Sequence, residues 1–279
     1  MSPALSPAMS TGITVTLDHG VQLIRIARPD KKNALTGDMY AAMSQALDTG
    51  EASDDIVCHV FTGSDGVFTA GNDMNDFMRR AAAFASGATT GMIAAPSTDF
   101  IRRLPKVTKP MLAAVDGLAV GIGVTLLLHC DIVYASPAAT FRAPFVNLGI
   151  IQEAGSSLTG PSRLGYNNAF ELLVAGALWD APRAREAGLV NAVVPAADLE
   201  KHAITMARGL AAKPREALYA ARRMMRGNPD DISRMIEAEV GVYTKLIGSA
   251  EAREAFAAFL EKRAPDFAKA RASAAKASR

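Results

Sequence analysis

Cysteine and histidine are scarce in this chain of 279 residues. The two cysteines, Cys58 and Cys130, both lie in apolar runs, and the four histidines are far apart in the sequence without metal-ligand spacing. Two buried thiols supply neither a disulfide framework nor a zinc cluster. We therefore expect no metal site, and we expect a protein of a reducing, cytoplasmic compartment.

Long apolar runs and strong charge are also missing. No apolar run reaches the roughly 18 residues that span a membrane, and the first twelve residues lack a basic start followed by an apolar core. The C-terminal Ala277-Ser278-Arg279 is not a peroxisomal Ser-Lys-Leu signal. The net charge is only +2. We expect neither nucleic acid nor a membrane as partner, and we expect flexible tails at residues 1–11 and 263–279.

The apolar pattern predicts an α/β protein. An apolar fraction of 49% in 279 residues is enough for a large core. Short strand-like runs alternate with helical ones, which is typical of strands backed by helices. The predicted strands are residues 13–17, 21–27, 56–62, 111–115 and 132–135, and the predicted helices between them are residues 38–48, 75–85 and 121–129.

From Asp198 onward the pattern is helical almost throughout. The predicted helices are residues 198–212, 214–225, 230–247 and 251–262. Ile236, Val240, Tyr243 and Ile247 form an apolar stripe at helical spacing, which is typical of a helix packed against the core of its own chain. Earlier in the chain, residues 86–97 are rich in Ala, Gly and Thr, and are interpreted either as a flap or as a plain surface loop.

Two turns of small residues carry the chemical signal. The run Phe68-Thr69-Ala70-Gly71-Asn72-Asp73-Met74 follows a strand-like segment, and so does the run from Asp116 to Gly123. Gly121 and Gly123 leave no side chain in the way, and Ile122 places its N–H at the start of a helix, where an anionic oxygen is favoured. Together with the N–H of Asn72 this predicts a two-donor oxyanion hole. The alternative is a pair of glycine turns needed only for tight packing of strand on helix.

Other motifs for phosphate binding or nucleophilic catalysis are missing. The glycine spacing is not G-x-G-x-x-G, no Gly-Lys-Ser/Thr follows either turn, and no G-x-S-x-G elbow occurs. Arg28, Lys31 and Lys32 are interpreted either as contacts for phosphates or as a solvated basic turn.

These segments resemble a known family. Ala70-Gly71-Asn72-Asp73 is similar to the A-G-x-D loop of the crotonase (enoyl-CoA hydratase/isomerase) superfamily, and the segment from Lys109-Pro110 to Gly123 is similar to its K-P-x-x-A-A-x-x-G-x-x-x-G-x-G motif. The likeness covers roughly residues 12–262. Further matching motifs are Arg28-Pro29, Asn33-Ala34-Leu35, Cys130-Asp131, Asn147-Leu148-Gly149 and Ala187-Gly188-Leu189-Val190.

The resemblance implies a spiral of repeated ββα units over residues 12–197 that holds the active site. It also implies a helical region, residues 198–262, that assembles homotrimers or dimers of trimers. The substrate would be an acyl-CoA thioester, so CoA enters as part of the substrate and no cofactor is expected. On this likeness the substrate-binding residues are Ala70, Gly71, Asn72, Asp73, Met74, Gly121 and Phe145, and Asp73 is expected to fix its loop or cap the following helix.

The sequence departs from the hydratase pattern at both catalytic positions. Crotonase-type hydratases use two glutamates, and the alignment of motifs puts Thr125 and Phe145 in their places. Neither side chain can do the work of a carboxylate. The usual hydration route with paired carboxylates is therefore disfavoured.

A different carboxylate, Glu153, follows a few residues later. The segment Glu153-Ala154-Gly155-Ser156-Ser157 resembles the P-E-x-x-S-S motif of peroxisomal-type Δ3,Δ2-enoyl-CoA isomerases, with Gln152 in place of the proline. The likeness implies that Glu153 is the catalytic base, which moves a proton from carbon 2 to carbon 4. The alternatives are a structural glutamate at a helix start, a hydratase or other acyl-CoA enzyme, and a non-catalytic acyl-CoA-binding protein.

Overall fold

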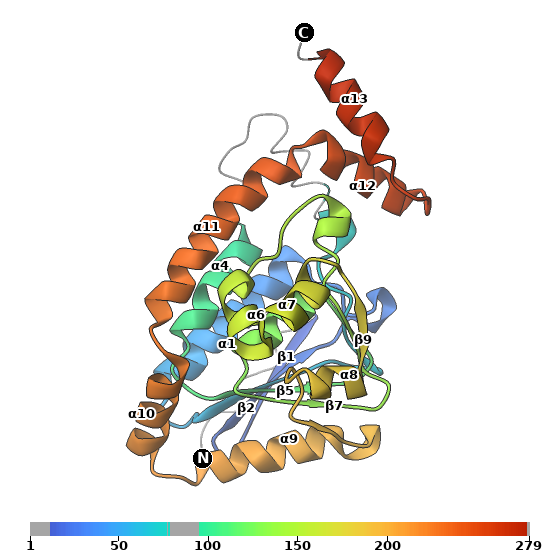
Figure 1. Cartoon of the computed structure of the whole chain (residues 1–279). Helices are drawn as coiled ribbons and strands as arrows, with labels where there is room; N and C mark the ends of the chain where they lie inside the picture. The colour runs from blue at the N-terminus through green and yellow to red at the C-terminus, as the bar shows by residue number, and fades with distance from the viewer. Residues whose placement is uncertain (1–11, 77, 79–94, 278–279) are drawn as a thin grey trace.

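The computed structural model describes residues 12–76, 78 and 95–277. The α/β prediction is confirmed: within these residues two sheets are packed with helices (Figure 1). The six-stranded sheet has the order β1-β2-β3-β5-β7-β10. Its strands are β1 (Ile13–Asp18), β2 (Val21–Ile26), β3 (Cys58–Thr62), β5 (Met111–Val115), β7 (Ile132–Ala135) and β10 (Ala192–Val193).

A second sheet of four short strands has the order β4-β6-β8-β9 in the described part of the chain. Its strands are β4 (Val67–Thr69), β6 (Leu118–Val120), β8 (Thr140–Arg142) and β9 (Leu178–Asp180). The sequence pattern does not predict this sheet, because runs of three residues show too little alternation to be recognised. Strands β3, β5 and β7 of the first sheet are followed along the chain by β4, β6 and β8 of the second, which gives the expected spiral of β-strand pairs.

The central strands β2, β3 and β5 of the larger sheet are buried on both faces. All pairs from β2 to β10 are parallel, and only the β1–β2 hairpin is antiparallel. Cys58 and Val60 of β3 pack in a cluster with helix α9, whereas Phe61 faces the opposite, larger cluster. Successive side chains of a strand point to opposite faces, so a strand between two helical layers is apolar at every position. This explains the continuous apolar runs in the sequence.

The helices surround the two sheets. Figure 1 shows α9 along one side of the larger sheet and α1, α4 and α11 on the other. In the first part of the chain the helices are α1 (Gly37–Ala52), α4 (Pro96–Arg103), α5 (Ile122–Thr125), α6 (Ser156–Leu164), α7 (Tyr166–Leu173) and α8 (Ala181–Glu186). Short 3-10 helices are η1 (Pro29–Lys31), η2 (Leu104–Lys106), η3 (Leu126–His129) and η4 (Val146–Leu148).

The C-terminal region is helical, as predicted. It contains α9 (Ala196–Ala211), α10 (Arg215–Arg226), α11 (Pro229–Ile247), α12 (Ala250–Leu260) and α13 (Phe267–Ala277). Helix α13 lies where the sequence analysis expected a frayed tail, and its alanine-rich composition accounts for the helix, since alanine has the highest helix propensity. Among the described helices, none has both the length and the apolar character needed to cross a membrane.

Several predicted segments have other boundaries or lie outside the described residues. The helix expected at 121–129 is divided into α5 and η3. The helix expected at 75–85 starts at Met74, but most of it, and nearly all of the segment 86–97, falls outside the described residues. The stripe on α11 packs on the core of its own chain, with Ile236 and Ile247 fully buried and Val240 and Tyr243 partly so.

Candidate active site

The two turns predicted to form an oxyanion hole lie side by side. Strands β4 and β6 pair in parallel, with Thr69 opposite Ala119, so both turns leave the same edge of the second sheet. Gly71 then approaches the other turn closely, because a Cβ built on it would lie 2.9 Å from the carbonyl oxygen of Val120. Its φ of 86° is in the left-handed region that favours glycine. Glycine at position 71 is therefore needed for the close approach of the two turns.

The N–H of Asn72 points away from the neighbouring chain segment. The N–H of Leu35 donates to the carbonyl of Gly71 at 2.8 Å, and the N–H of Asp73 donates to the carbonyl of Leu35 at 2.9 Å. In extended backbone, successive peptide groups point to opposite sides. The N–H of Asn72 therefore faces the opposite side, and no described residue accepts from it.

Ile122 supplies a second available N–H. It is the first residue of α5, where N–H groups have no partner within the helix. Gly121 precedes it with φ 58° and ψ −115°, and its own N–H donates to the carbonyl of Arg142 at 2.9 Å. Within the described residues nothing accepts from the N–H of Ile122. The geometry thus supports the predicted pair of donors.

Asp73 fixes the first turn, as expected. Its Oδ1 accepts from the N–H groups of Asn75 at 3.0 Å and Asp76 at 3.2 Å, and its Oδ2 accepts from Arg28 at 2.7 Å. Burial opposes ionisation, but the hydrogen bonds from Arg28 and from the backbone hold the pKa of Asp73 below its ordinary value. Arg28 also donates to the carbonyl of Ala34 at 3.0 Å. Arg28, which the sequence offered as a phosphate contact, binds the turn instead.

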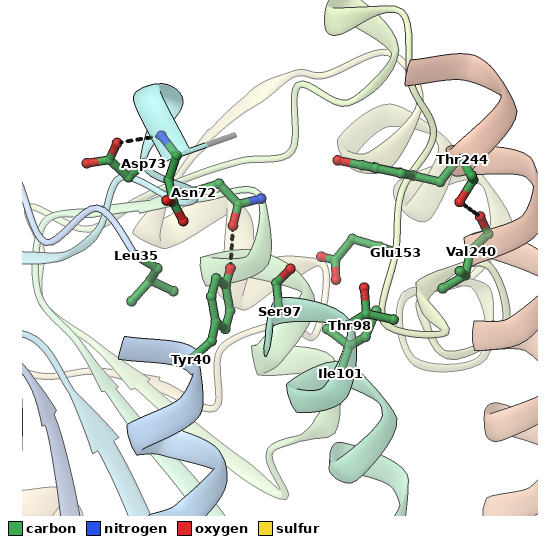
Figure 2. A pocket seen from close by; sticks show the side chains of 12 residues that line it. Leu35, Tyr40, Asn72, Asp73, Ser97, Thr98, Ile101, Glu153, Val240 and Thr244 are labelled. Carbon is green, nitrogen blue, oxygen red and sulfur yellow. Dashed lines mark hydrogen bonds between the residues drawn. The ribbon is translucent and has the colours of Figure 1, made fainter. Parts of the chain in front are cut away.

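The side chain of Asn72 is held by Tyr40, a residue that the motifs did not indicate. The hydroxyl of Tyr40 on α1 donates to Oδ1 of Asn72 at 2.5 Å (Figure 2). Tyr40 is almost completely buried and packs against Phe100 of α4, with ring centroids 5.6 Å apart. The first oxyanion turn is thus anchored to two helices of the core.

Glu153 lies on the segment between η4 and α6. It is followed by Ala154 and Gly155, both in the left-handed region with φ of 62° and 70°. The hydroxyl of Thr125 donates to its Oε1 at 2.5 Å. Burial raises the pKa of Glu153 to about 8, the negative charge of Glu239 adds to this effect, and the hydrogen bond from Thr125 opposes it.

The carboxyl group of Glu153 faces a cavity. Figure 2 shows Glu153 across the cavity from Asn72 and Tyr40, with Ser97 and Thr98 of α4 below. The residues that line this cavity are Leu35, Tyr40, Asn72, Asp73, Asp76, Ser97, Thr98, Ile101, Glu153, Val240, Tyr243 and Thr244. It therefore combines one partly buried acid with the first oxyanion turn, and three of its walls come from α1, α4 and α11.

A second cavity adjoins the first and shares Asn72 and Tyr243 with it. Its walls include most of the residues predicted for substrate binding, together with Ile122: Ala70, Gly71, Asn72, Met74, Gly121, Ile122 and Phe145. Asp73 lines only the first cavity. Phe145 is buried, and the tip of its ring lies 3.9 Å from a Cβ built on Gly121, so it covers the second turn with an apolar surface.

Sequence reasoning missed part of the site. Tyr40 lies in a predicted helix without any motif, and Val240 and Tyr243 were recognised only as core positions. Glu239 was not noticed, although its neighbours belong to the apolar stripe of α11. An acid next to such a stripe is a signal, because glutamate is almost never fully buried unless it is paired.

Comparisons with known proteins agree with this architecture. The family model described as "Enoyl-CoA hydratase/isomerase" matches residues 16–270. A solved enoyl-CoA hydratase/isomerase from Pseudoalteromonas atlantica is 35% identical with a TM-score of 0.84, covering 92% of this chain and 99% of that one. The fold and the two turns therefore define a member of the crotonase superfamily. The chain belongs to the enoyl-CoA hydratase/isomerase family of acyl-CoA enzymes.

The curated relatives differ in the reaction that they catalyse. Rat "Enoyl-CoA delta isomerase 2" is 37% identical over 78% of this chain, and the match spans 55% of that relative's length. The "1,2-epoxyphenylacetyl-CoA isomerase" of Escherichia coli is 33% identical over 90% of this chain and 96% of its own. The family thus defines the acyl-CoA class of substrate, and the particular reaction has to be argued from the site.

Proposed function

We propose that this protein is an enoyl-CoA isomerase that converts 3-enoyl-CoA to 2-enoyl-CoA, with Glu153 as the single base. The observation that carries the proposal is the partly buried carboxyl group of Glu153, which faces a cavity that the first oxyanion turn also lines. Thr125 and Phe145, at the positions of the two hydratase glutamates, provide a hydroxyl group and an apolar ring instead.

The reaction follows from these positions. The carboxylate of Glu153 removes a proton from carbon 2 of the thioester, and the electron pair moves into the carbonyl to form a dienolate. The N–H groups of Asn72 and Ile122 stabilise the enolate oxygen. Glu153 then returns the same proton to carbon 4, the double bond ends between carbons 2 and 3, and no water is consumed.

The pKa of about 8 for Glu153 suits this role. A general base works best when its pKa is near the operating pH, because a stronger base removes the proton more readily while enough of it remains ionised. The hydrogen bond from Thr125 orients the carboxyl group. In a hydratase a second acid or base would have to activate water, and the hydroxyl of Thr125 is already committed to Glu153.

The proposal has further parts that rest on the family resemblance and on the composition. CoA enters as part of the substrate, and no resident cofactor takes part. The residues expected to bind the thioester are residues 70–74, Gly121 and Phe145. Homotrimers or dimers of trimers are expected, built with the helices of residues 198–262, and a cytoplasmic location is expected from the cysteine content. Light scattering on the purified protein measures the assembly directly.

The test is turnover of a trans-3-enoyl-CoA, followed through the conjugated 2-enoyl thioester, for the wild type and Glu153→Gln. We expect the variant to fold normally and to lose turnover by about two orders of magnitude or more, as for removal of a general base. Glu237→Gln is the matched control, because Glu237 is exposed on α11 and pairs with Arg102 at 2.7 Å. Near-normal turnover in Glu153→Gln would refute the assignment of the base.

The same assay separates the alternatives. Hydration of crotonyl-CoA that exceeds isomerisation would identify a hydratase, and turnover of neither substrate despite binding of the CoA ester would identify a binding protein or an enzyme of another acyl-CoA reaction.

A further inference from the structure

The carboxyl group of Glu239 on α11 is buried, and it binds the segment that carries Glu153. Glu239 is only 3% exposed. Its Oε2 accepts from the N–H of Gly155 at 2.6 Å, and its Oε1 accepts from the N–H of Ser157 at 2.8 Å. Both N–H groups lie within four residues of the proposed base. Each oxygen of Glu239 thus accepts a hydrogen bond from the backbone next to Glu153.

Glu239 supplies acceptors that α6 lacks. The first N–H groups of a helix have no partner within the helix, and a side chain at the N-cap usually accepts from one of them. The N-cap of α6 is Gly155, which has no side chain. The carboxyl group from α11 takes that role across the packed interface, where a Cβ on Gly155 would lie 2.7 Å from Cγ2 of Ile232.

The segment is held from its other side by His129. Nε2 of His129 donates to the carbonyl of Ala154 at 2.7 Å, and Arg226 donates to Nδ1 at 3.0 Å. Burial and the charge of Arg226 lower the pKa of His129 to about 3, so the ring is neutral. The peptide between Ala154 and Gly155 is therefore fixed at its oxygen by His129 and at its N–H by Glu239.

Helix α11 also builds the wall of the cavity that Glu153 faces. Val240, Tyr243 and Thr244 line it within about one and a half turns of Glu239. An acyl chain that contacts this wall and the base that acts on it are thus positioned by the same helix.

We propose that Glu239 is the positioning residue of the active site, which holds the Glu153 segment in register with α11 through its two backbone hydrogen bonds. The inference rests on the proposed role of Glu153 as the base. Glu239 does not touch the substrate, and it acts through the backbone of residues 155–157.

The charge of Glu239 affects a quantity that can be measured, the pKa of Glu153. Its negative charge raises the pKa of Glu153, so removal of the charge should lower that pKa. Burial raises the pKa of Glu239 itself, and the hydrogen bonds from Ser157 and Gly155 counteract this.

On the described elements around this segment, other charged groups have hydrogen-bond partners of their own. On α4, Arg102 pairs with Glu237 and Arg103 pairs with Asp48. On α6, Arg163 donates to the carbonyls of Leu127, Leu128 and Cys130. Asp73 pairs with Arg28, Asp76 accepts from the N–H of Gly37, and Glu254 of α12 pairs with Arg263. Removal of the charge of Glu239 should therefore alter mainly the pKa of Glu153.

Two variants distinguish the effect of the charge of Glu239 from the effect of the length of its side chain. Glu239→Gln keeps the length of the side chain and removes the charge, and it presents an NH₂ group where one backbone N–H needs an acceptor. We expect kcat to fall about tenfold to a hundredfold, as for misplacement of a catalytic group by about 1 Å. We also expect the acidic limb of the kcat/KM profile to move to lower pH. Glu239→Asp keeps the charge but shortens the side chain, so kcat should fall while the acidic limb of the kcat/KM profile stays at the wild-type pH. Glu237→Gln should change neither.

Titration of the Glu153 carboxyl carbon by ¹³C NMR, assigned with Glu153→Gln, gives a readout that needs no activity. A lower pKa of Glu153 in folded Glu239→Gln supports the inference, whether or not the wild-type protein turns over 3-enoyl-CoA. Absence of wild-type turnover would count against the proposed function alone. An active wild type with unchanged kcat and unchanged Glu153 pKa in Glu239→Gln would overturn the inference. If Glu239→Gln does not fold, wild-type kcat in Glu239→Asp overturns it equally.

Discussion

Replacement of Glu153 by glutamine should stabilise the protein, and the gain should grow with pH. The pKa of Glu153 is raised from 4.5 to about 8 in the folded protein. Between these values the unfolded chain releases its proton while the folded protein retains it. Wild-type stability therefore decreases as the pH rises through this window, by up to about 1.4 kcal/mol for each pH unit. Glutamine carries no ionisable group, so the variant lacks this loss.

The magnitude at neutral pH follows from the same two values. Linkage gives a difference in unfolding free energy between variant and wild type that increases by about 3 kcal/mol from pH 4.5 to pH 7, and it levels off above pH 8. An increase of this size would come from an active-site carboxyl group kept for function at the expense of stability.

The assay is denaturation by guanidinium chloride at a fixed protein concentration, at intervals from pH 4.5 to pH 9. Glu237→Gln is the control, because its hydrogen bond to Arg102 lowers the pKa of Glu237. Its titration therefore lies below this pH range, and the difference between this variant and the wild type should stay nearly constant. A constant difference between wild type and Glu153→Gln across this range would refute the raised pKa, and with it the view that Glu153 is held in a dry environment.

Two further predictions concern the hydrogen bonds around the site. Thr125→Val removes the hydroxyl that donates to Glu153 at 2.5 Å, and this hydrogen bond lowers the pKa of Glu153. The acidic limb of the kcat/KM profile, which lies near pH 8 in the wild type, should therefore move to higher pH. An acidic limb at the wild-type pH would contradict this prediction. Tyr40→Phe removes the bond to Asn72 and should lower kcat/KM about fivefold, the effect of one lost hydrogen bond. Unchanged kcat/KM, as expected for the exposed Tyr166→Phe control, would show that the side chain of Asn72 needs no anchor.

The larger sheet could be predicted because its strands carry a strong signal. Strands such as Met111–Val115 are buried on both faces and are therefore apolar at every position. The strands of the second sheet have only three residues each, and their pairing depends on partners distant in sequence, such as Thr69 with Ala119. Local patterns contain no information on such pairs.

The candidate active site also has a part that could be predicted from the sequence and a part that could not. The chemistry that depends on local backbone can be inferred from the sequence: glycine at positions 71 and 121 adopts positive φ angles that place two N–H groups beyond two strands. The sequence also indicates Glu153 through its short motif. Parallel pairing of β4 with β6 then brings the two turns together, as the motifs required.

The environment of the acid depends on packing between segments that are distant in the sequence. The raised pKa of Glu153 arises from burial beneath α4 and α11 and from the charge of Glu239, which is 86 residues away in the chain. Electrostatic energies depend on distance and on exclusion of water, and both are properties of packed surfaces rather than of any short segment. The sequence therefore identified the groups that can react, and the packing of distant helices set their proton affinity.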